Sequence, residues 1–180
     1  MVTMETDRLI LRDQLETDLN DMHRLWSDKK TMYYLDDIIS NTIEDTVENL
    51  KIGIANSDGH YFCICDKNTG NYMGNMGYSI THITPFGKIV HLGYMLLPKF
   101  HGQGYMTEAV KKVIEFAFTK DDCIRITTGC HKENDASRKV MEKTGFRREG
   151  EKLKAVYHDG IMKDRLEYAI NKDDFINSIV

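Results

Sequence analysis

The sequence has 180 residues, of which 41% are hydrophobic and 29% are charged, and its formal net charge is -4. This length and this balance predict one globular domain over residues 1–180 and exclude a disordered or fibrous chain. The slightly acidic charge argues against a nucleic-acid partner. With only 2 prolines, the sequence contains no proline-rich linker.

Residues 1–12 are dense in charge and contain no apolar stretch of signal-peptide length. No later apolar run approaches the ~20 residues that span a bilayer. We therefore expect a cytoplasmic protein without a membrane partner. The 4 cysteines include no Cys-x-x-Cys pair, so their spacing does not indicate a metal site. Cys63 and Cys65 lie in one apolar run, which predicts buried free thiols on one face of a strand.

The N-terminal third predicts one strand and two helices. Residues 7–12 read as an apolar strand, Thr17 is expected to open the first helix, and Thr42 is expected to cap the second. The segment from Ser57 to Gly59 should end the second helix. Apolar residues at spacings of three and four form one stripe on each helix: Leu19, Met22 and Trp26, then Ile43, Val47, Leu50 and Ile54.

The hydrophobic period then changes from helical to alternating. Three strands are expected at 60–66, 72–81 and 88–97, because these runs are rich in aromatic and β-branched residues. Turn residues at 67–70 and 85–87 join them. Three consecutive strands with short connections predict an antiparallel meander.

The C-terminal half is expected to alternate helices and strands. Its predicted elements are a helix over 104–118, a strand over 123–129, a helix opened by Asn134 and closed by Gly145, a strand from Phe146, an Asp159-Gly160 hairpin turn, a strand over 163–170 and a short helix from Lys172. The resulting order, β-α-α-β-β-β-α-β-α-β-β, predicts a mixed α/β (α+β) fold with a largely antiparallel sheet flanked by helices.

The turn after the third strand of the meander carries the strongest functional signal. Pro98 ends the strand, and Gly102 and Gly104 permit a tight turn before the next helix. The unpaired N–H groups of a helix start suit a phosphate or pyrophosphate. A Walker A loop is excluded because its Gly-Lys-Ser/Thr is absent, and a Rossmann turn because Thr107 replaces the third glycine. A coenzyme A loop and a turn without ligand remain, and the Gly-x-Gly pattern alone favours the latter.

This turn resembles motif A of the GNAT superfamily of N-acetyltransferases, in which Gln/Arg-x-x-Gly-x-Gly/Ala binds the coenzyme A pyrophosphate. His101 and Met106 depart from that pattern at its first and last positions. The string from Gly102 to Ala109 also resembles the RimJ/RimL-like branch, which commonly has Gly-x-Gly-Tyr-Ala-Thr-Glu-Ala. The resemblance implies that main-chain N–H groups bind the pyrophosphate, at Gly102, Gln103, Gly104, Tyr105, Met106 and Thr107.

Further segments resemble that branch in the same order along nearly the whole chain, at residues 6–12, 26–28, 32–35, 92–96 and 134–146. The resemblance therefore implies a GNAT-like fold for the single domain. Together the segments are specific, although each one alone is weak.

The same resemblance implies roles for residues outside the glycine turn. Met95 and Leu96 would pair with the pantetheine arm and help to polarise the thioester carbonyl; otherwise they are ordinary core. Asn134 would reach the same arm, or only cap a helix. Ser137 would donate a hydrogen bond to the departing thiolate, or be satisfied locally. The tyrosine that many GNAT enzymes use for that step is replaced by Met141.

The general base has no clear candidate in the sequence. Some branch members carry a glutamate two residues after the alanine that corresponds to Ala155, and the nearest match here, Val156, cannot titrate. His91, Glu149, Glu151 and Tyr157 are the substitutes, although a solvated face or sheet packing explains each of them as well. An amine that is already partly neutral can lose its proton through water.

The resemblance implies an acetyl-CoA-dependent N-acetyltransferase that needs no metal and acts by direct transfer. Its acceptor would be a primary amine, either a protein N-terminus, such as that of a ribosomal protein, or a small amine. The rival interpretation is a non-catalytic acyl-CoA sensor on the same fold, favoured slightly by the missing tyrosine. The sequence leaves open whether the chain forms a homodimer.

Overall fold

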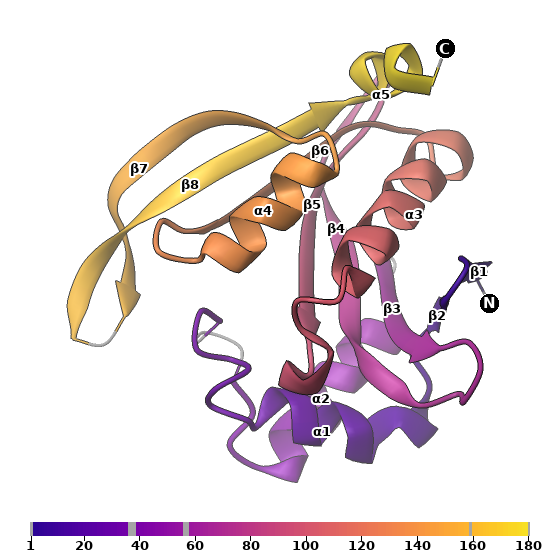
Figure 1. The fold of residues 1–180 in the computed structure, drawn as a ribbon, viewed down its shortest axis with the longest axis vertical. Coiled ribbons are helices and arrows are strands. Elements are labelled where there is room, and N and C mark those ends of the chain that lie inside the picture. The colour runs from indigo at the N-terminus through magenta and orange to yellow at the C-terminus, as the bar shows by residue number, and fades with distance from the viewer. Residues whose placement is uncertain (1, 36–38, 56–57, 159, 180) are drawn as a thin grey trace. The chain divides into compact units, whose positions relative to one another are not determined.

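The computed structural model describes residues 2–35, 39–55, 58–158 and 160–179 (Figure 1). Its strands are hydrogen-bonded in the order β1-β2-β3-β4-β5-β6-β8-β7. The chain divides into two compact units. The first unit comprises Met1–Ser79 and Gly93–Lys112, and the second comprises Ile80–Leu92 and Val113–Val180. Three elements contribute residues to both units: β4 (Tyr72–Thr84), β5 (Gly87–Leu96) and α3 (Tyr105–Lys120).

The first unit contains three successive antiparallel ladders. They join β1 (Thr3–Glu5) to β2 (Leu9–Asp13), β2 to β3 (Gly59–Asp66), and β3 to β4. One row of partners crosses these strands from Met4 through Leu11 and Ile64 to Gly74, and all four residues are buried. The expected first strand is confirmed as β2, whereas β1 is an addition that the sequence pattern did not predict. β1 has three residues, so its pairing with β2 defines it rather than its own periodicity.

The first helix begins later than predicted. Residues Glu16–Asp18 form one turn of 3-10 helix, and α1 (Leu19–Trp26) follows, so Thr17 does not open it. The buried carboxylate of Asp18 accounts for the shift, because it accepts the Leu15 N–H at 2.8 Å and pairs with Arg12 at 2.7 Å. These contacts hold the chain in the 3-10 turn before the α-helix starts.

The second helix, α2 (Ile43–Ile54), begins as predicted. Thr42 caps it by accepting the Asp45 N–H, and Asp45 accepts the Thr42 N–H in return. The predicted apolar stripe is wrong at its end, because Ile54 is 46% exposed. Thr46 is buried instead, since its hydroxyl pairs with His23 of α1 at 2.7 Å. The predicted helix stop at Ser57 lies outside the described residues.

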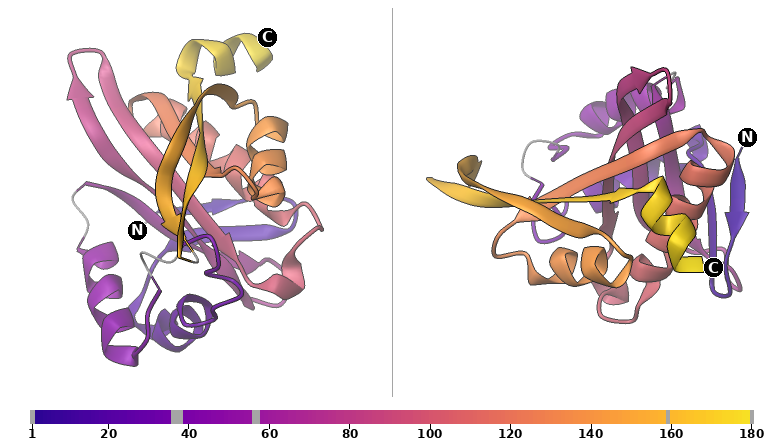
Figure 2. Two further views of the ribbon diagram at one scale, coloured as in Figure 1. Left: turned by 90° about the vertical axis from the view of Figure 1, so that its left-hand side faces the viewer. Right: turned by 90° about the horizontal axis from the view of Figure 1, so that it is seen from above.

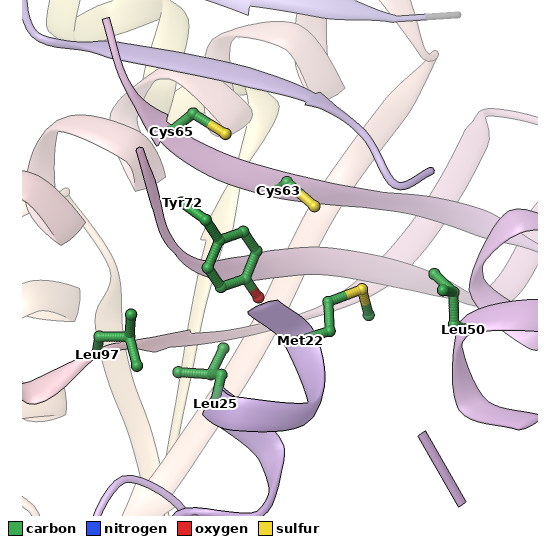
Figure 3. Packing of buried hydrophobic residues seen from close by; sticks show 7 residues of the cluster. All are labelled: Met22, Leu25, Leu50, Cys63, Cys65, Tyr72 and Leu97. Atoms are coloured by element: carbon green, nitrogen blue, oxygen red, sulfur yellow. The ribbon is translucent and has the colours of Figure 1, made fainter. Parts of the chain in front are cut away.

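Seven buried side chains form the core cluster of the first unit (Figure 3): Met22, Leu25, Leu50, Cys63, Cys65, Tyr72 and Leu97. They join the two helices to β3 and β4. Both cysteines are free, as predicted. Burial and the neighbouring Asp18 raise the pKa of the Cys63 thiol, which therefore stays protonated in this core.

The second unit is built on the parallel pair of β5 with β6 (Cys123–His131). β8 (Ile161–Asn171) pairs antiparallel with β6, and β7 (Arg147–His158) pairs antiparallel with β8. Figure 2 shows β7 and β8 as a long twisted two-stranded ribbon. The last strand, β8, therefore lies between β6 and β7. The sequence predicts the final hairpin but makes no prediction for the position of β8 in the sheet. The Asp159 of the predicted hairpin turn lies outside the described residues.

The remaining helices agree with the predicted pattern. Five apolar residues of α3 at helical spacing are buried: Ala109, Val110, Val113, Ile114 and Ala117. α4 (Asp135–Lys143) is followed by Gly145 at φ 89°, and α5 (Lys172–Ile179) ends the described chain. The mixed, largely antiparallel fold predicted from the sequence is confirmed. Within the described ranges, no helix combines the length and apolar character needed to cross a membrane.

Candidate functional site

The glycine turn between β5 and α3 is held by its own polar groups. β5 ends at Leu96, Pro98–Phe100 form one 3-10 turn, and α3 starts at Tyr105. The His101 ring donates from Nε2 to the Leu96 carbonyl at 2.7 Å. The Gln103 side chain donates to the Lys99 carbonyl at 2.9 Å. These two bonds fold the turn back on the end of β5.

Both glycines of the turn adopt left-handed backbone conformations. Gly102 has φ 73° and Gly104 has φ 82°, a region that side chains with a Cβ disfavour. A Cβ at Gly102 would meet nothing within 4 Å, so the space in front of the turn is open. The first helical bond runs from the Glu108 N–H to the Gly104 carbonyl at 3.0 Å. The turn therefore fits a coenzyme A pyrophosphate, because the space in front of it is open and its backbone conformation is already set.

The first N–H groups of α3 lie ahead of that bond. In an α-helix the first four N–H groups have no partner within the helix. Tyr105 and Thr107 are half-buried, and the Met106 side chain is buried. Met106 therefore occupies the core side of the helix, and its departure from the family pattern leaves its main-chain N–H in the first turn. The positive end of the helix dipole adds to the attraction for an anion.

A charged contact joins the first turn of α3 to the N-terminal segment. The carboxylate of Glu108 accepts hydrogen bonds from the Thr6 hydroxyl at 2.5 Å and from the Arg8 backbone N–H at 3.0 Å. The Arg8 guanidinium pairs with it at 2.6 Å. Burial favours the protonated acid, but these contacts outweigh it and hold the pKa of Glu108 below its ordinary value. No pattern in the sequence predicts this pair, because its partners lie 100 residues apart.

Met95 and Leu96 lie at the end of β5, as the sequence predicted. The Met95 side chain packs against the core cluster and Leu96 is buried, so both side chains are ordinary core. The Leu97 N–H donates to the Met73 carbonyl of β4 at 2.9 Å. Because successive residues of a strand point their N–H groups to opposite sides, the Leu96 N–H is directed away from β4.

Asn134 and Ser137 lie together at the start of α4, in the second unit. Asn134 caps the helix by accepting the Ser137 N–H at 3.1 Å. The Ser137 side chain hydrogen-bonds to the thiol of Cys130, whose pKa is raised above its ordinary value by burial. The local capping interpretation of Asn134 is therefore confirmed. The roles of these two residues towards an acyl donor stay predictions.

His91 of β5 has a defined tautomer. Its Nδ1 lies 3.1 Å from the Thr127 hydroxyl, and that hydroxyl donates its single proton to the Val90 carbonyl at 3.0 Å. Nδ1 must therefore carry the ring proton, which leaves Nε2 as a lone-pair acceptor. Burial and the positive charge of Arg165 lower the pKa of His91 below its ordinary value, so the ring is neutral near pH 7.

The other candidate bases have roles on the surface. Glu149 pairs with Arg125, and Glu151 pairs with Lys132 at 2.5 Å. Tyr157 is 69% exposed on β7. Surface ion pairs of this kind contribute little to stability. Among the described residues, no group of three or more His, Cys, Asp or Glu side chains could hold a metal ion.

Comparison with known proteins gives the family. The model of the acetyltransferase (GNAT) domain matches residues 8–147. The uncharacterized N-acetyltransferase YoaA of Bacillus subtilis is 28% identical over 174 residues, which cover 94% of this chain and 96% of that protein.

Two solved structures have the same fold. The ribosomal-protein-S5-alanine acetyltransferase from Vibrio fischeri is 26% identical, with a TM-score of 0.81 and coverage of 97% of this chain and 98% of that one. The spermidine N-acetyltransferase from Vibrio cholerae, solved with CoA and spermine, has a TM-score of 0.85 at 19% identity and covers 96% of this chain and 100% of that one. Because the family model matches residues 8–147, which include the glycine turn, this chain belongs to the GNAT family. It is an N-acetyltransferase that takes its acetyl group from acetyl-CoA.

Proposed function

We propose that this enzyme, a RimJ/RimL-like member of the family, acetylates the primary amine of a protein N-terminus by direct transfer from acetyl-CoA. The glycine turn ahead of α3 is the observation that carries the proposal, because both of its glycines are preset for an anion. The likeness to the ribosomal-protein-S5-alanine acetyltransferase supports a protein acceptor. We also propose that residues 1–180 act as one domain, since the matched region 8–147 includes segments of both units.

The glycine turn would hold the pyrophosphate through the main-chain N–H groups of residues 102–107. Backbone donors suit this ligand because they are fixed before it binds and cost no side-chain ordering. The N-terminus of α3 adds partial positive charge at the same place. The departures at His101 and Met106 are compatible with this role, because neither removes a backbone donor.

The end of β5 would polarise the thioester carbonyl. The Leu96 N–H is the donor that we assign, because it points away from β4, whereas the Leu97 N–H is already bonded to Met73. The Leu96 carbonyl, in the next peptide unit, accepts a hydrogen bond from His101, which holds the end of β5 against the glycine turn. A fixed donor facing the oxygen on which negative charge develops lowers the barrier to attack by the amine.

Ser137 would stabilise the departing thiolate. The amine nitrogen forms a bond to the acetyl carbon, the carbon–sulfur bond breaks, and the nitrogen releases a proton. The Ser137 hydroxyl would donate a hydrogen bond to the sulfur as its charge develops. The backbone N–H of Ser137 is already engaged by Asn134, so the helix start is ordered independently of the hydroxyl. Asn134 would contact the pantetheine arm as well as capping α4.

The acceptor would arrive partly neutral. A chain-terminal amine has a pKa of about 7.7–8.0, whereas a lysine side chain has about 10.4. A larger fraction of the terminal amine is therefore able to attack near neutral pH, and water suffices to take its proton.

A panel of acceptors tests the proposal. Thiol release from acetyl-CoA is measured with peptides carrying free or blocked N-termini, with polyamines and with amino-acid amides. We expect turnover with free N-terminal peptides and none with blocked ones. Turnover confined to polyamines would reject the protein acceptor, and coenzyme A binding without turnover on any amine would favour the sensor interpretation. A Gly104→Val variant serves as the matched control. Any thiol release that persists in this variant does not require the glycine turn.

A further inference from the structure

The carboxylate of Glu108 lies in the first turn of α3 but is bonded entirely by the N-terminal segment. Its Oε1 accepts from the Thr6 hydroxyl at 2.5 Å and from the Arg8 N–H at 3.0 Å. Its Oε2 accepts from Arg8 Nε at 2.7 Å and pairs with Arg8 Nη2 at 2.6 Å. An acidic side chain in the first turn commonly bonds the N–H groups of its own helix. Here these contacts direct the carboxylate to another segment.

The same guanidinium also contacts the glycine turn. Arg8 Nη1 donates to the Gln103 carbonyl at 3.1 Å, and Arg8 Cζ lies 4.2 Å from the centre of the Tyr105 ring. Arg8 Nη2 would lie 3.5 Å from a Cβ placed on Gly104. One side chain thus contacts Gln103 and Tyr105 and lies beside Gly104, although it is 44% exposed.

The charges define what this contact does. A carboxylate in the first turn of α3 would repel a pyrophosphate bound at the same helix start, since like charges at close range oppose binding. Arg8 neutralises that carboxylate with a paired hydrogen-bond geometry that a lysine cannot reproduce. It also holds the Gln103 carbonyl by a hydrogen bond, so the peptide bond that follows has a fixed orientation.

We propose that Arg8 is a positioning residue for coenzyme A, which acts by neutralising Glu108 and by fixing the Gln103 peptide of the glycine turn. This inference rests on the proposed function of that turn. The N-terminal segment would thereby control affinity for the acyl donor from a position 100 residues away in the sequence. Two rival roles are possible for the same side chain. In the first, the Arg8–Glu108 pair only fastens the N-terminal segment to α3. In the second, Arg8 binds a phosphate of the ligand directly.

Charge-changing variants separate these three roles by calorimetric titration with coenzyme A. Arg8→Gln leaves Glu108 without its counter-charge, so we expect affinity to fall about 10-fold. Glu108→Gln leaves the positive charge of Arg8 unpaired beside the turn, so affinity should stay unchanged or rise up to about 3-fold. The double variant should recover most of the loss caused by Arg8→Gln. If the contact is only a fastener, both single variants weaken binding together with the melting temperature, and the double variant recovers nothing.

A second ligand tests direct phosphate contact. Titration with 3′-dephospho-CoA should show the same fold loss for Arg8→Gln as titration with coenzyme A. A loss that is seen with coenzyme A and disappears with 3′-dephospho-CoA would overturn the positioning role in favour of a direct contact to the 3′-phosphate. Salt should reduce the loss, because the interaction between the uncompensated carboxylate and the ligand is screened.

The controls keep the inference separable from the proposed function. Arg24→Gln removes an exposed arginine that pairs with Asp21 on α1, and it should leave affinity unchanged. Arg8→Lys keeps the charge but loses the paired geometry, so its affinity should lie between wild type and Arg8→Gln, and it replaces the latter if that variant does not fold. Failure of the wild-type chain to bind coenzyme A would reject the proposed function. Wild-type binding with full affinity in Arg8→Gln would reject this inference alone.

Discussion

The starts of α3 and α4 are both helix N-termini, but they are held in different ways. α4 is ordered by its neighbours in sequence, because Asn134 accepts the N–H of Ser137 three residues later. α3 has left-handed glycines before it and a carboxylate that is bonded by Thr6 and Arg8 of the N-terminal segment. A side-chain cap satisfies one N–H of α4, whereas the turn before α3 presents its backbone N–H groups to solvent or to a ligand. Under the proposed function, α3 would bind an anion through its backbone, whereas α4 would act through its side chains.

The largest expected effect comes from the turn of α3. Gly104→Val places a branched side chain at φ 82°, where it is strained, and next to the open ligand space. We expect affinity for coenzyme A to fall by more than about 100-fold while the chain stays folded, with the strain itself contributing about 1–3 kcal/mol of destabilisation. Calorimetry and circular dichroism measure the two effects.

Gly70→Val is the matched control for that variant. Gly70 has φ 72° in the turn between β3 and β4, and a Cβ there would meet nothing within 4 Å. This variant should show a similar loss of stability with unchanged affinity for coenzyme A. Equal affinity losses in both variants would mean that general strain, and not the glycine turn of α3, controls binding.

The next effect belongs to the hydroxyl at the start of α4. Ser137→Ala removes the hydrogen bond proposed for the thiolate but keeps the capped backbone N–H. We expect kcat to fall about 10-fold with little change in KM for acetyl-CoA, which corresponds to about 1.4 kcal/mol of transition-state stabilisation. Steady-state kinetics provide the test. An unchanged kcat would leave Ser137 with its local contacts only.

Asn134→Ala tests whether the cap of α4 stabilises the fold. It removes the side chain that accepts the Ser137 N–H, so the free energy of unfolding should decrease by about 1 kcal/mol. Chemical denaturation measures this loss. Asn134→Asp keeps an acceptor at the same position and should restore most of the stability. Failure of aspartate to restore it would show that the cap is not the stabilising contact.

The pH dependence of the reaction tests whether His91 takes part. With two acceptors of different amine pKa, the inflection of kcat/KM should follow each amine if water removes the proton. A common inflection below the ordinary histidine value, lost in His91→Gln, would assign the proton to Nε2 of His91 instead. Folding lowers the pKa of His91 below its ordinary value. The neutral His91 therefore contributes to the stability of the folded chain above about pH 6.5, and this contribution is lost as the pH falls towards the pKa of His91 in the folded chain.

Several elements were predictable because their signals are local. The apolar spacing of α3, the cap of α2 at Thr42 and the glycine after α4 all depend on residues within one or two helical turns. The meander of β3, β4 and β5 follows from alternation and short turns. The glycine turn belongs to the same class, because two glycines between a strand and a helix permit a tight turn with positive φ by themselves.

Other features were decided by contacts between distant segments. Leu166 and Ile170 of β8 pair with Cys130 and Ile126 of β6. Because these two β8 residues are apolar and buried on one face, β8 lies between β6 and β7. The burial of Thr46 in place of Ile54 depends on His23 of α1. Neither feature has a period along the chain that a single sequence would reveal.

The candidate site divides in the same way. The sequence by itself determined the glycines, the donors of the turn and the cap of α4, because local backbone chemistry needs no partner from elsewhere. Only the tertiary structure decided that Arg8 and Glu108 pair beside the turn and that Thr127 sets the tautomer of His91. Charge pairing and proton placement depend on which atoms meet in space, and residues 100 positions apart meet only after the chain has folded.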